Sequence, residues 1–209
     1  MSTTGKVAGI VSNLVTVQVD GPVAENELCY IETKGTKLLA EVIKVNADKA
    51  SVQVFESTRG LKGGDKVEFL GRMLEASLGP GLLSSVYDGL QNDLTTMTDV
   101  FLKRGEYTDP LDHEKMWDFT PLAKVGDKVQ AASWLGEVKE GWLPHKIMVP
   151  FSFNGEYTIK SIVEAGSYNI DHVIAVLTDE EGEDVNVTMV QKWPVKVAVK
   201  GYKEKPRPQ

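Results

Sequence analysis

Short runs of alternating apolar and polar residues fill the first 71 positions, and turn residues separate them. This period of two is typical of antiparallel strands. The runs predict strands at residues 6–11, 14–19, 28–32, 37–45, 50–55 and 65–70. Ser12-Asn13 between the first two runs predicts a two-residue hairpin loop. Six short strands over residues 1–71 predict a closed β-barrel, because closure removes exposed strand edges.

The pattern becomes helical after residue 71. Gly79-Pro80-Gly81 predicts a rigid corner, because proline fixes its own φ and restricts the residue before it. Apolar residues then recur with helical spacing at positions 82, 83, 86, 87 and 90, and Asp88-Gly89 predicts a helix end. A second helix is predicted from Asn92 or Asp93 to Gly105, with apolar and basic positions at Leu94, Met97, Phe101, Lys103 and Arg104. Residues 72–105 are therefore predicted to form a short helical connector.

Residues 106–188 return to short apolar runs joined by Gly and Asp turns. Strands are predicted near 117–121, 125–129, 134–138, 145–150, 155–159 and 173–177. The fold class is therefore mainly β, with a second, barrel-sandwich-like domain after the connector. Residues 189–197 predict one more strand, and Pro194 within it places that strand at a sheet edge.

The order of motifs in this second module also resembles the biotinyl and lipoyl carriers, which gives an alternative function. A carrier presents its modified lysine on an exposed hairpin tip. Lys146 is the candidate, but it begins an apolar run and has no turn residue beside it except Pro144. An ordinary solvent-facing lysine is the preferred interpretation.

Composition narrows the function classes. The 209 residues carry a net charge of −7, which argues against a nucleic-acid partner because such proteins usually present a basic face. The single cysteine, Cys29, cannot form an internal disulfide, which fits a reducing cytoplasm. No apolar run reaches 18 residues, so no segment is expected to cross a membrane.

Catalytic and metal-binding motifs are not evident. His113, His145 and His172 are scattered, and the acidic run at 179–184 lacks the calcium-loop spacing and predicts a charged hairpin turn. A phosphate-binding loop needs G-x-x-x-x-G-K-[ST], but Gly5-Lys6 is followed by Val7. We therefore predict no catalytic, cofactor-binding or metal-binding residues in this chain.

Several segments together resemble a known family. They are Phe55–Leu61 followed by Gly64–Val67, Gly79–Leu94, His145–Pro150, Gln191–Val195 and Tyr202–Lys205. In this order they resemble the N-terminal part of the catalytic A subunits of V-type ATPases. The resemblance implies an N-terminal barrel (1–71), the start of a nucleotide domain (72–105), an inserted bulge domain (106–188), and a return towards the nucleotide domain (189–209) that stops before the P-loop.

The resemblance also implies a function for the parent subunit. That subunit would hydrolyse or synthesise ATP with Mg²⁺, coupled to H⁺ or Na⁺ transport, in a hetero-hexameric ring with B subunits. The bulge would contact the peripheral stalk, and the membrane would be reached only through the assembled complex, from the cytoplasm. The fragment alone is predicted to be inactive and without cofactors, and part of the apolar face at Leu82, Leu83, Val86 and Leu90 is expected to lack cover. The alternative is a stand-alone two-module β protein, either a carrier or a binding module.

Overall fold

The computed structural model describes residues 3–83, 85–95, 105 and 107–198. These residues divide into two compact units. The first contains residues up to Leu74 together with Gly105 and Tyr107, and the second contains the remainder from Glu75 onwards. Within the described residues every regular element is a strand, so no helix long and apolar enough to span a membrane is found there.

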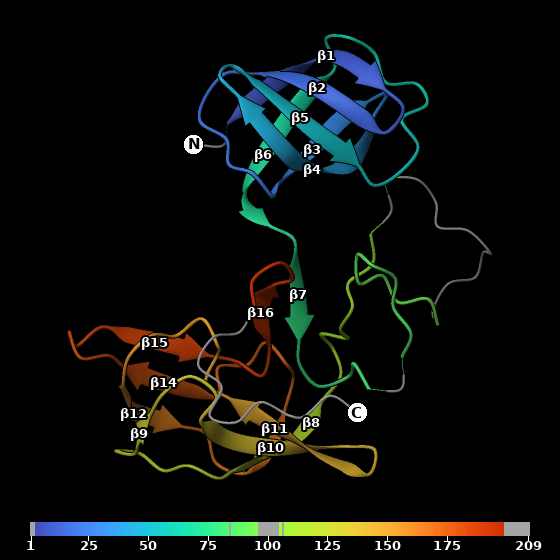
Figure 1. The fold of residues 1–209 in the computed structure, drawn as a ribbon. Helices are drawn as coiled ribbons and strands as arrows, with labels where there is room; N and C mark the ends of the chain where they lie inside the picture. Colours follow the sequence, from blue (N-terminus) through green and yellow to red (C-terminus); the bar gives the residue numbers. More distant parts are fainter. Residues whose placement is uncertain (1–2, 84, 96–104, 106, 199–209) are drawn as a thin grey trace, which may run out of the picture. The chain divides into compact units, whose positions relative to one another are not determined.

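The first unit is a closed barrel of six antiparallel strands (Figure 1). Its hydrogen-bonded order is β1-β2-β5-β4-β3-β6, and β6 pairs back with β1. The strands are β1 (Thr4–Val11), β2 (Leu14–Val19), β3 (Glu27–Thr33), β4 (Thr36–Asn46), β5 (Lys49–Val54) and β6 (Lys66–Met73). The predicted six-stranded barrel is confirmed.

Side chains at alternate strand positions point inward and fill the barrel core. Val15 and Val17 on β2 point inward at every second position, and Ile31 and Phe69 complete the buried centre from β3 and β6. The Cys29 thiol lies in the same core, where burial raises its pKa to about 12. Cys29 therefore behaves as a small apolar residue rather than a reactive thiol.

The second unit contains two four-stranded sheets around one apolar core (Figure 1). Their orders are β11-β10-β8-β13 and β15-β14-β12-β9. Phe119 and Leu135 from the first sheet share the core with Ile159 and Leu177 from the second. The strands are β8 (Trp117–Pro121), β9 (Lys128–Val129), β10 (Trp134–Glu140), β11 (Leu143–Met148), β12 (Tyr157–Ile162), β13 (Gly166–Tyr168), β14 (Ala175–Thr178) and β15 (Asp184–Val187).

A separate two-stranded sheet joins the two ends of this unit. β7 (Glu75–Leu78) pairs antiparallel with β16 (Gln191–Pro194), and Leu78 lies opposite Gln191. Pro194 therefore belongs to an edge strand, as its sequence predicted. The pairing brings together the two ends of residues 79–190.

The predicted helix over residues 82–90 is wrong. The described residues of this range, 82, 83 and 85–90, form turns and irregular chain, with one isolated bridge from Tyr87 to Asp93. The physical reason is that the Asp88 carboxylate accepts the backbone N–H groups of Leu90 and Asn92, which a helix would use otherwise. For the second predicted helix, the structure describes only positions 92–95 and 105, which are not helical, and residues 96–104 lie outside the described part.

Candidate functional site

The three histidines lie in the second unit, and each contacts different residues. His113 contacts two aspartates, His145 contacts Glu140, and His172 stacks on the Tyr168 ring at 4.7 Å between ring centroids. In the part of the chain that the structure describes, no three His, Cys, Asp or Glu side chains gather in a way that could hold a metal ion.

A buried carboxylate holds the Gly79-Pro80-Gly81 corner in place. Glu140, the last residue of β10, accepts the backbone N–H groups of Gly81 at 2.7 Å and Leu83 at 3.1 Å through Oε1. Its Oε2 lies 2.6 Å from Nδ1 of His145 on β11. Hydrogen bonds to an ionised group are stronger than neutral ones, so one side chain fixes both the corner and the hairpin. No role for Glu140 was predicted from the sequence.

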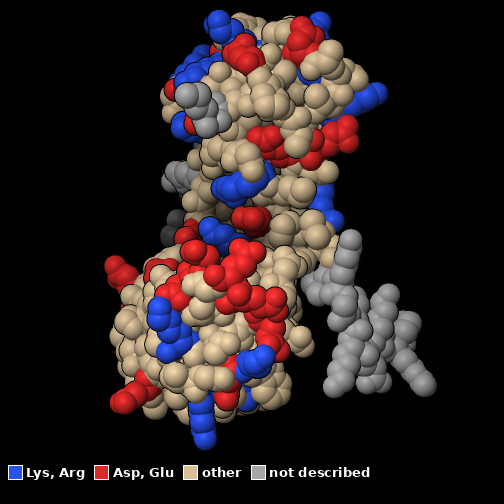
Figure 2. All heavy atoms as spheres, turned by 90° about the vertical axis from the view of Figure 1, so that its left-hand side faces the viewer, with Lys and Arg blue, Asp and Glu red and all other residues tan. Residues whose placement is uncertain are grey.

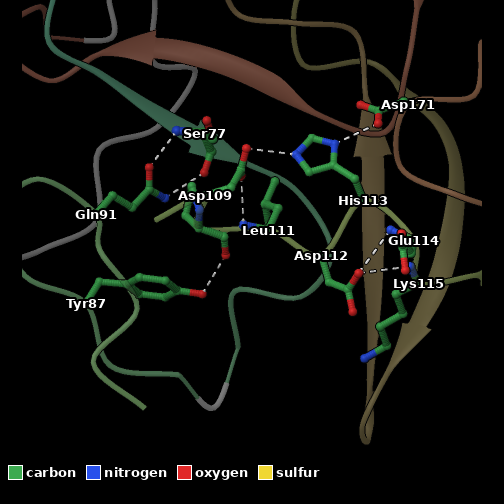
Figure 3. A network of polar contacts seen from close by, with 11 residues as sticks. Ser77, Tyr87, Gln91, Asp109, Leu111, Asp112, His113, Glu114, Lys115 and Asp171 are labelled. Carbon is green, nitrogen blue, oxygen red and sulfur yellow. Dashed lines mark hydrogen bonds and ion pairs between the residues drawn. The ribbon is translucent and has the colours of Figure 1, made fainter. Parts of the chain in front are cut away.

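The segment after the corner is organised by side-chain caps rather than by a helix. Asn92 is only 2% exposed, and its Oδ1 accepts the backbone N–H of Thr108 at 3.0 Å. Gln91 exchanges two hydrogen bonds with the backbone of Ser77 on β7, at 2.8 and 2.7 Å (Figure 3). These contacts link residues 77, 91–92 and 108, which lie far apart in the sequence.

His113 forms a clasp between Asp109 and Asp171 (Figure 3). Its Nε2 lies 3.0 Å from Asp109, and its Nδ1 lies 2.6 Å from Asp171, which precedes β14. The hydrogen bond to Asp171 is the main cause that raises the pKa of His113, and the contact with Asp109 adds to it. The imidazole therefore favours its protonated form, in which both nitrogens donate. This arrangement joins segments and offers no nucleophile.

Lys146, the lysine of the carrier alternative, is held in place. Its ammonium group forms an ion pair with Glu137 across the β10–β11 hairpin and lies 5.0 Å from the centre of the Trp134 ring. Only 28% of the side chain is exposed, and the hairpin tip is formed by Gly141-Trp142 instead. A swinging arm needs a free lysine at such a tip, so the carrier interpretation is not favoured.

The acidic run is a hairpin turn, as predicted. β14 and β15 pair antiparallel on either side of it, with Thr178 opposite Asp184. The Asp179 carboxylate accepts the N–H groups of Glu181 and Glu183, both at 2.9 Å. Asp179 therefore acts as a cap within the turn.

Two groups of apolar side chains are exposed. The first lies at one end of the barrel, where Val11 (75% exposed) pairs with Leu14 across the β1–β2 turn. Phe55 is near this turn, because the N–H of the preceding residue, Val54, donates to the Asn13 carbonyl. In the second unit, Leu83 and Val86 are exposed, whereas Leu82 packs against the core. Part of the predicted apolar face over residues 82–90 is thus uncovered. Contiguous exposed apolar surface commonly marks an interaction site.

Comparison with known families identifies both units. Residues 7–71 match the family described as the ATP synthase alpha/beta family, beta-barrel domain. Residues 108–196 match the ATPsynthase alpha/beta subunit barrel-sandwich domain. The two matches fall on the closed barrel and on the two-sheet unit.

Three longer proteins similar to this chain are each named V-type ATP synthase alpha chain. The chain is 47% identical over 209 residues to the V-type ATP synthase alpha chain of Treponema denticola, covering 99% of this chain. It is 47% identical over 208 residues to that of Borrelia garinii subsp. bavariensis and 48% identical to that of Borrelia duttonii, covering 98% in each case. The chain spans 36% of the length of each of these relatives.

Proposed function

Because this chain belongs to the ATP synthase alpha/beta family and corresponds to the N-terminal region of a V-type ATP synthase alpha chain, we propose that it is the assembly part of that subunit. The barrel joins the ring of alternating catalytic and B subunits, and the barrel-sandwich unit contacts the peripheral stalk. The complete subunit binds ATP and Mg²⁺ outside these 209 residues and couples ATP hydrolysis or synthesis to ion transport. The complex works at the cytoplasmic face of a membrane.

One observation carries the domain arrangement. β7 and β16 pair side by side, so the chain leaves at Leu78 and returns at Gln191 to the same place. An inserted domain needs adjacent ends, because the host domain must continue across it. The pairing therefore supports assigning residues 72–105 and 189–209 to the nucleotide domain and residues 106–188 to an insertion.

The insertion is tested in the complete subunit by replacing residues 112–188 with a short Gly-Ser linker. The linker can close because Leu111 and Met189 both lie beside Gly79. We expect the shortened subunit to bind ATP and enter the ring, while the ring loses its peripheral stalk in native mass spectrometry. Loss of ATP binding would show that residues 112–188 belong to the nucleotide domain itself.

The ring contact is tested at the barrel end. Val11→Glu in the complete subunit places a charge on the apolar patch formed by Val11, Leu14 and Phe55. We expect the yield of assembled ring to fall at least tenfold, because an unpaired charge in an interface must lose its hydration. Val125→Glu, at an exposed turn of the second unit, is the matched control and should assemble normally. Equal assembly of both variants would contradict the proposal.

The isolated chain is proposed to be inactive towards ATP. The sequence contains no G-x-x-x-x-G-K-[ST] segment, whose backbone N–H groups and lysine would surround the phosphates. Isothermal titration of the 209-residue chain with Mg-ATP should show no binding at millimolar nucleotide. Micromolar affinity would contradict this part of the proposal.

A further inference from the structure

We propose that a pocket beside the β10–β11 hairpin binds an acidic peptide segment of a partner protein through a carboxylate and a neighbouring apolar side chain. The pocket has a volume of about 460 Å³. Its walls include Lys115, Trp117, Lys139, Glu140, Trp142 and Leu143.

Trp142 supplies the apolar contact. It stands at the hairpin tip and is 87% exposed, the highest value among the large apolar side chains of the described residues. Leu143 and Leu83 flank it in the same pocket and are also exposed. A tryptophan can bury 150–250 Å² on contact, and this residue type is enriched among the residues that dominate binding energy. The hairpin holds the ring out from the core, where it contributes little to folding.

Two lysines line the pocket, although the surrounding unit is mostly acidic. Residues 108–188 carry fifteen carboxylate side chains and six lysines, and Figure 2 shows the acidic groups as the larger clusters on one face of this unit. Three of the lysines form ion pairs, with Glu156, Glu137 and Asp184. The remaining lysines are Lys115, Lys124 and Lys139.

Two of those three lysines line this one pocket. Lys115 and Lys139 have no carboxylate partner within the described part of the chain, although acidic residues outnumber lysines around them. The Lys115 ammonium lies 4.2 Å from the centre of the Trp117 ring, which orients it over the pocket wall. A ligand carboxylate would therefore meet two cations that no internal acid neutralises.

The acidic side chain of the wall is already engaged by other groups. Glu140, the acidic member of the wall, does not compete, since its oxygens already accept two N–H groups and contact His145.

The occupant is a peptide rather than a nucleic acid. Two lysines and one exposed tryptophan match a carboxylate next to an apolar side chain, and the volume fits a few side chains. A nucleic acid would have to approach a chain of net charge −7, whose carboxylates repel phosphates. The peptide site can be tested on the 209-residue chain alone, so its test does not depend on the proposed role in a rotary ATPase.

The test is selection from a random dodecapeptide library displayed on phage, with the wild-type chain as bait. We expect the selected peptides to carry Asp or Glu beside Leu, Ile, Phe or Trp. The most enriched peptide is then labelled with fluorescein and titrated by anisotropy against single variants. Lys139→Glu and Trp142→Ala should each raise its Kd at least tenfold, and added salt should weaken binding to the wild type.

The matched control is Lys124→Glu, which reverses the same charge on the third of these lysines, outside the pocket. It should leave the Kd within twofold, and all variants should retain the wild-type circular dichroism spectrum. The proposal is overturned if no acidic motif is enriched, or if Lys139→Glu binds as the wild type does. It is also overturned if sedimentation velocity shows a dimer that Trp142→Ala abolishes, since a second copy would then occupy the pocket.

Discussion

The barrel and the second unit are held together in different ways. The barrel is one continuous ladder in which each strand pairs with two neighbours, so its backbone polar groups are satisfied by regular structure. The second unit contains two open four-stranded sheets and long irregular stretches over residues 79–83, 85–95 and 108–116. There, individual side chains such as Asp88, Asn92 and Glu140 satisfy the backbone.

Buried carboxylates occur in both units, but they hold different kinds of backbone. In the barrel, Glu27 accepts the N–H groups of Ala24 at 3.0 Å and of Gly71, 44 positions away, at 2.7 Å, and the strands of Glu27 and Gly71 already pair with each other. In the second unit, Glu140 reaches Gly81 and Leu83, which are 59 and 57 positions away in the sequence. The second unit therefore depends more on single residues than the barrel does.

The largest expected effect is the loss of stability when a buried ring is removed from one of the two cores. Phe69→Ala in the barrel and Phe119→Ala in the second unit each remove a fully buried ring, which costs about 3–5 kcal/mol. The four tryptophans, Trp117, Trp134, Trp142 and Trp193, all lie in the second unit, so their fluorescence reports on that unit alone. In urea unfolding, Phe119→Ala should lower the fluorescence midpoint.

Phe69→Ala is the matched comparison for that experiment. It should leave the tryptophan midpoint unchanged and shift only the part of the far-ultraviolet circular dichroism transition that belongs to the barrel. If both variants lower the fluorescence midpoint equally, the two units unfold as one, and the contrast between two separately stabilised regions is incorrect.

A smaller effect is expected at the carboxylate that holds the corner. Glu140→Ala leaves the N–H groups of Gly81 and Leu83 without their acceptor, and we expect a loss of about 2–3 kcal/mol from the second unit. Amide hydrogen exchange of Gly81 and Leu83 should accelerate with it. Glu137→Ala, on the same strand, removes a partly exposed ion pair and should cost less than about 1 kcal/mol. Equal losses from the two variants would mean that the corner is held by other contacts.

The same contrast explains what could be predicted from the sequence. The six barrel strands were predicted within a few residues of their observed bounds, because their alternation and their turns are local and three of the six pairings join consecutive strands. Val15 and Val17, for example, alternate with less buried neighbours on a strand joined to β1 by a two-residue loop. Local pattern and final structure agree there.

The second unit was predicted less completely, for a physical reason. Leu82, Leu83, Val86, Tyr87 and Leu90 have helical spacing, yet contacts with distant residues fix Leu83 and Tyr87 in place. Glu140 binds Gly81 and Leu83, and the Tyr87 hydroxyl donates to the Pro110 carbonyl at 3.1 Å (Figure 3). These partners are 23–59 residues distant, so a window of local periodicity does not contain them. β7 and β13 were missed because they are short strands.

The smallest expected effect concerns the His113 clasp and depends on pH. The contacts with Asp171 and Asp109 raise the pKa of His113 in the folded state above its ordinary value of 6.5. The clasp therefore contributes its full stability below about pH 6.5, and the contribution disappears as pH rises through the folded-state pKa. Because the side chain is nearly half exposed, the effect should stay below about 1 kcal/mol.

Proton NMR titration of the histidine Cε1–H resonances checks this directly. The His113 resonance should titrate above pH 6.5, and Asp171→Asn should move its midpoint down, because the main cause of the raised pKa is removed. His113→Gln should also abolish the small pH-dependent part of the stability of the second unit, whereas His172→Gln, which removes only a ring stacked on Tyr168, should preserve it. A His113 midpoint that does not respond to Asp171→Asn would show that the clasp is not formed in solution, and order in residues 109–113 would then rest on backbone caps such as that of Asp109 on the Leu111 N–H.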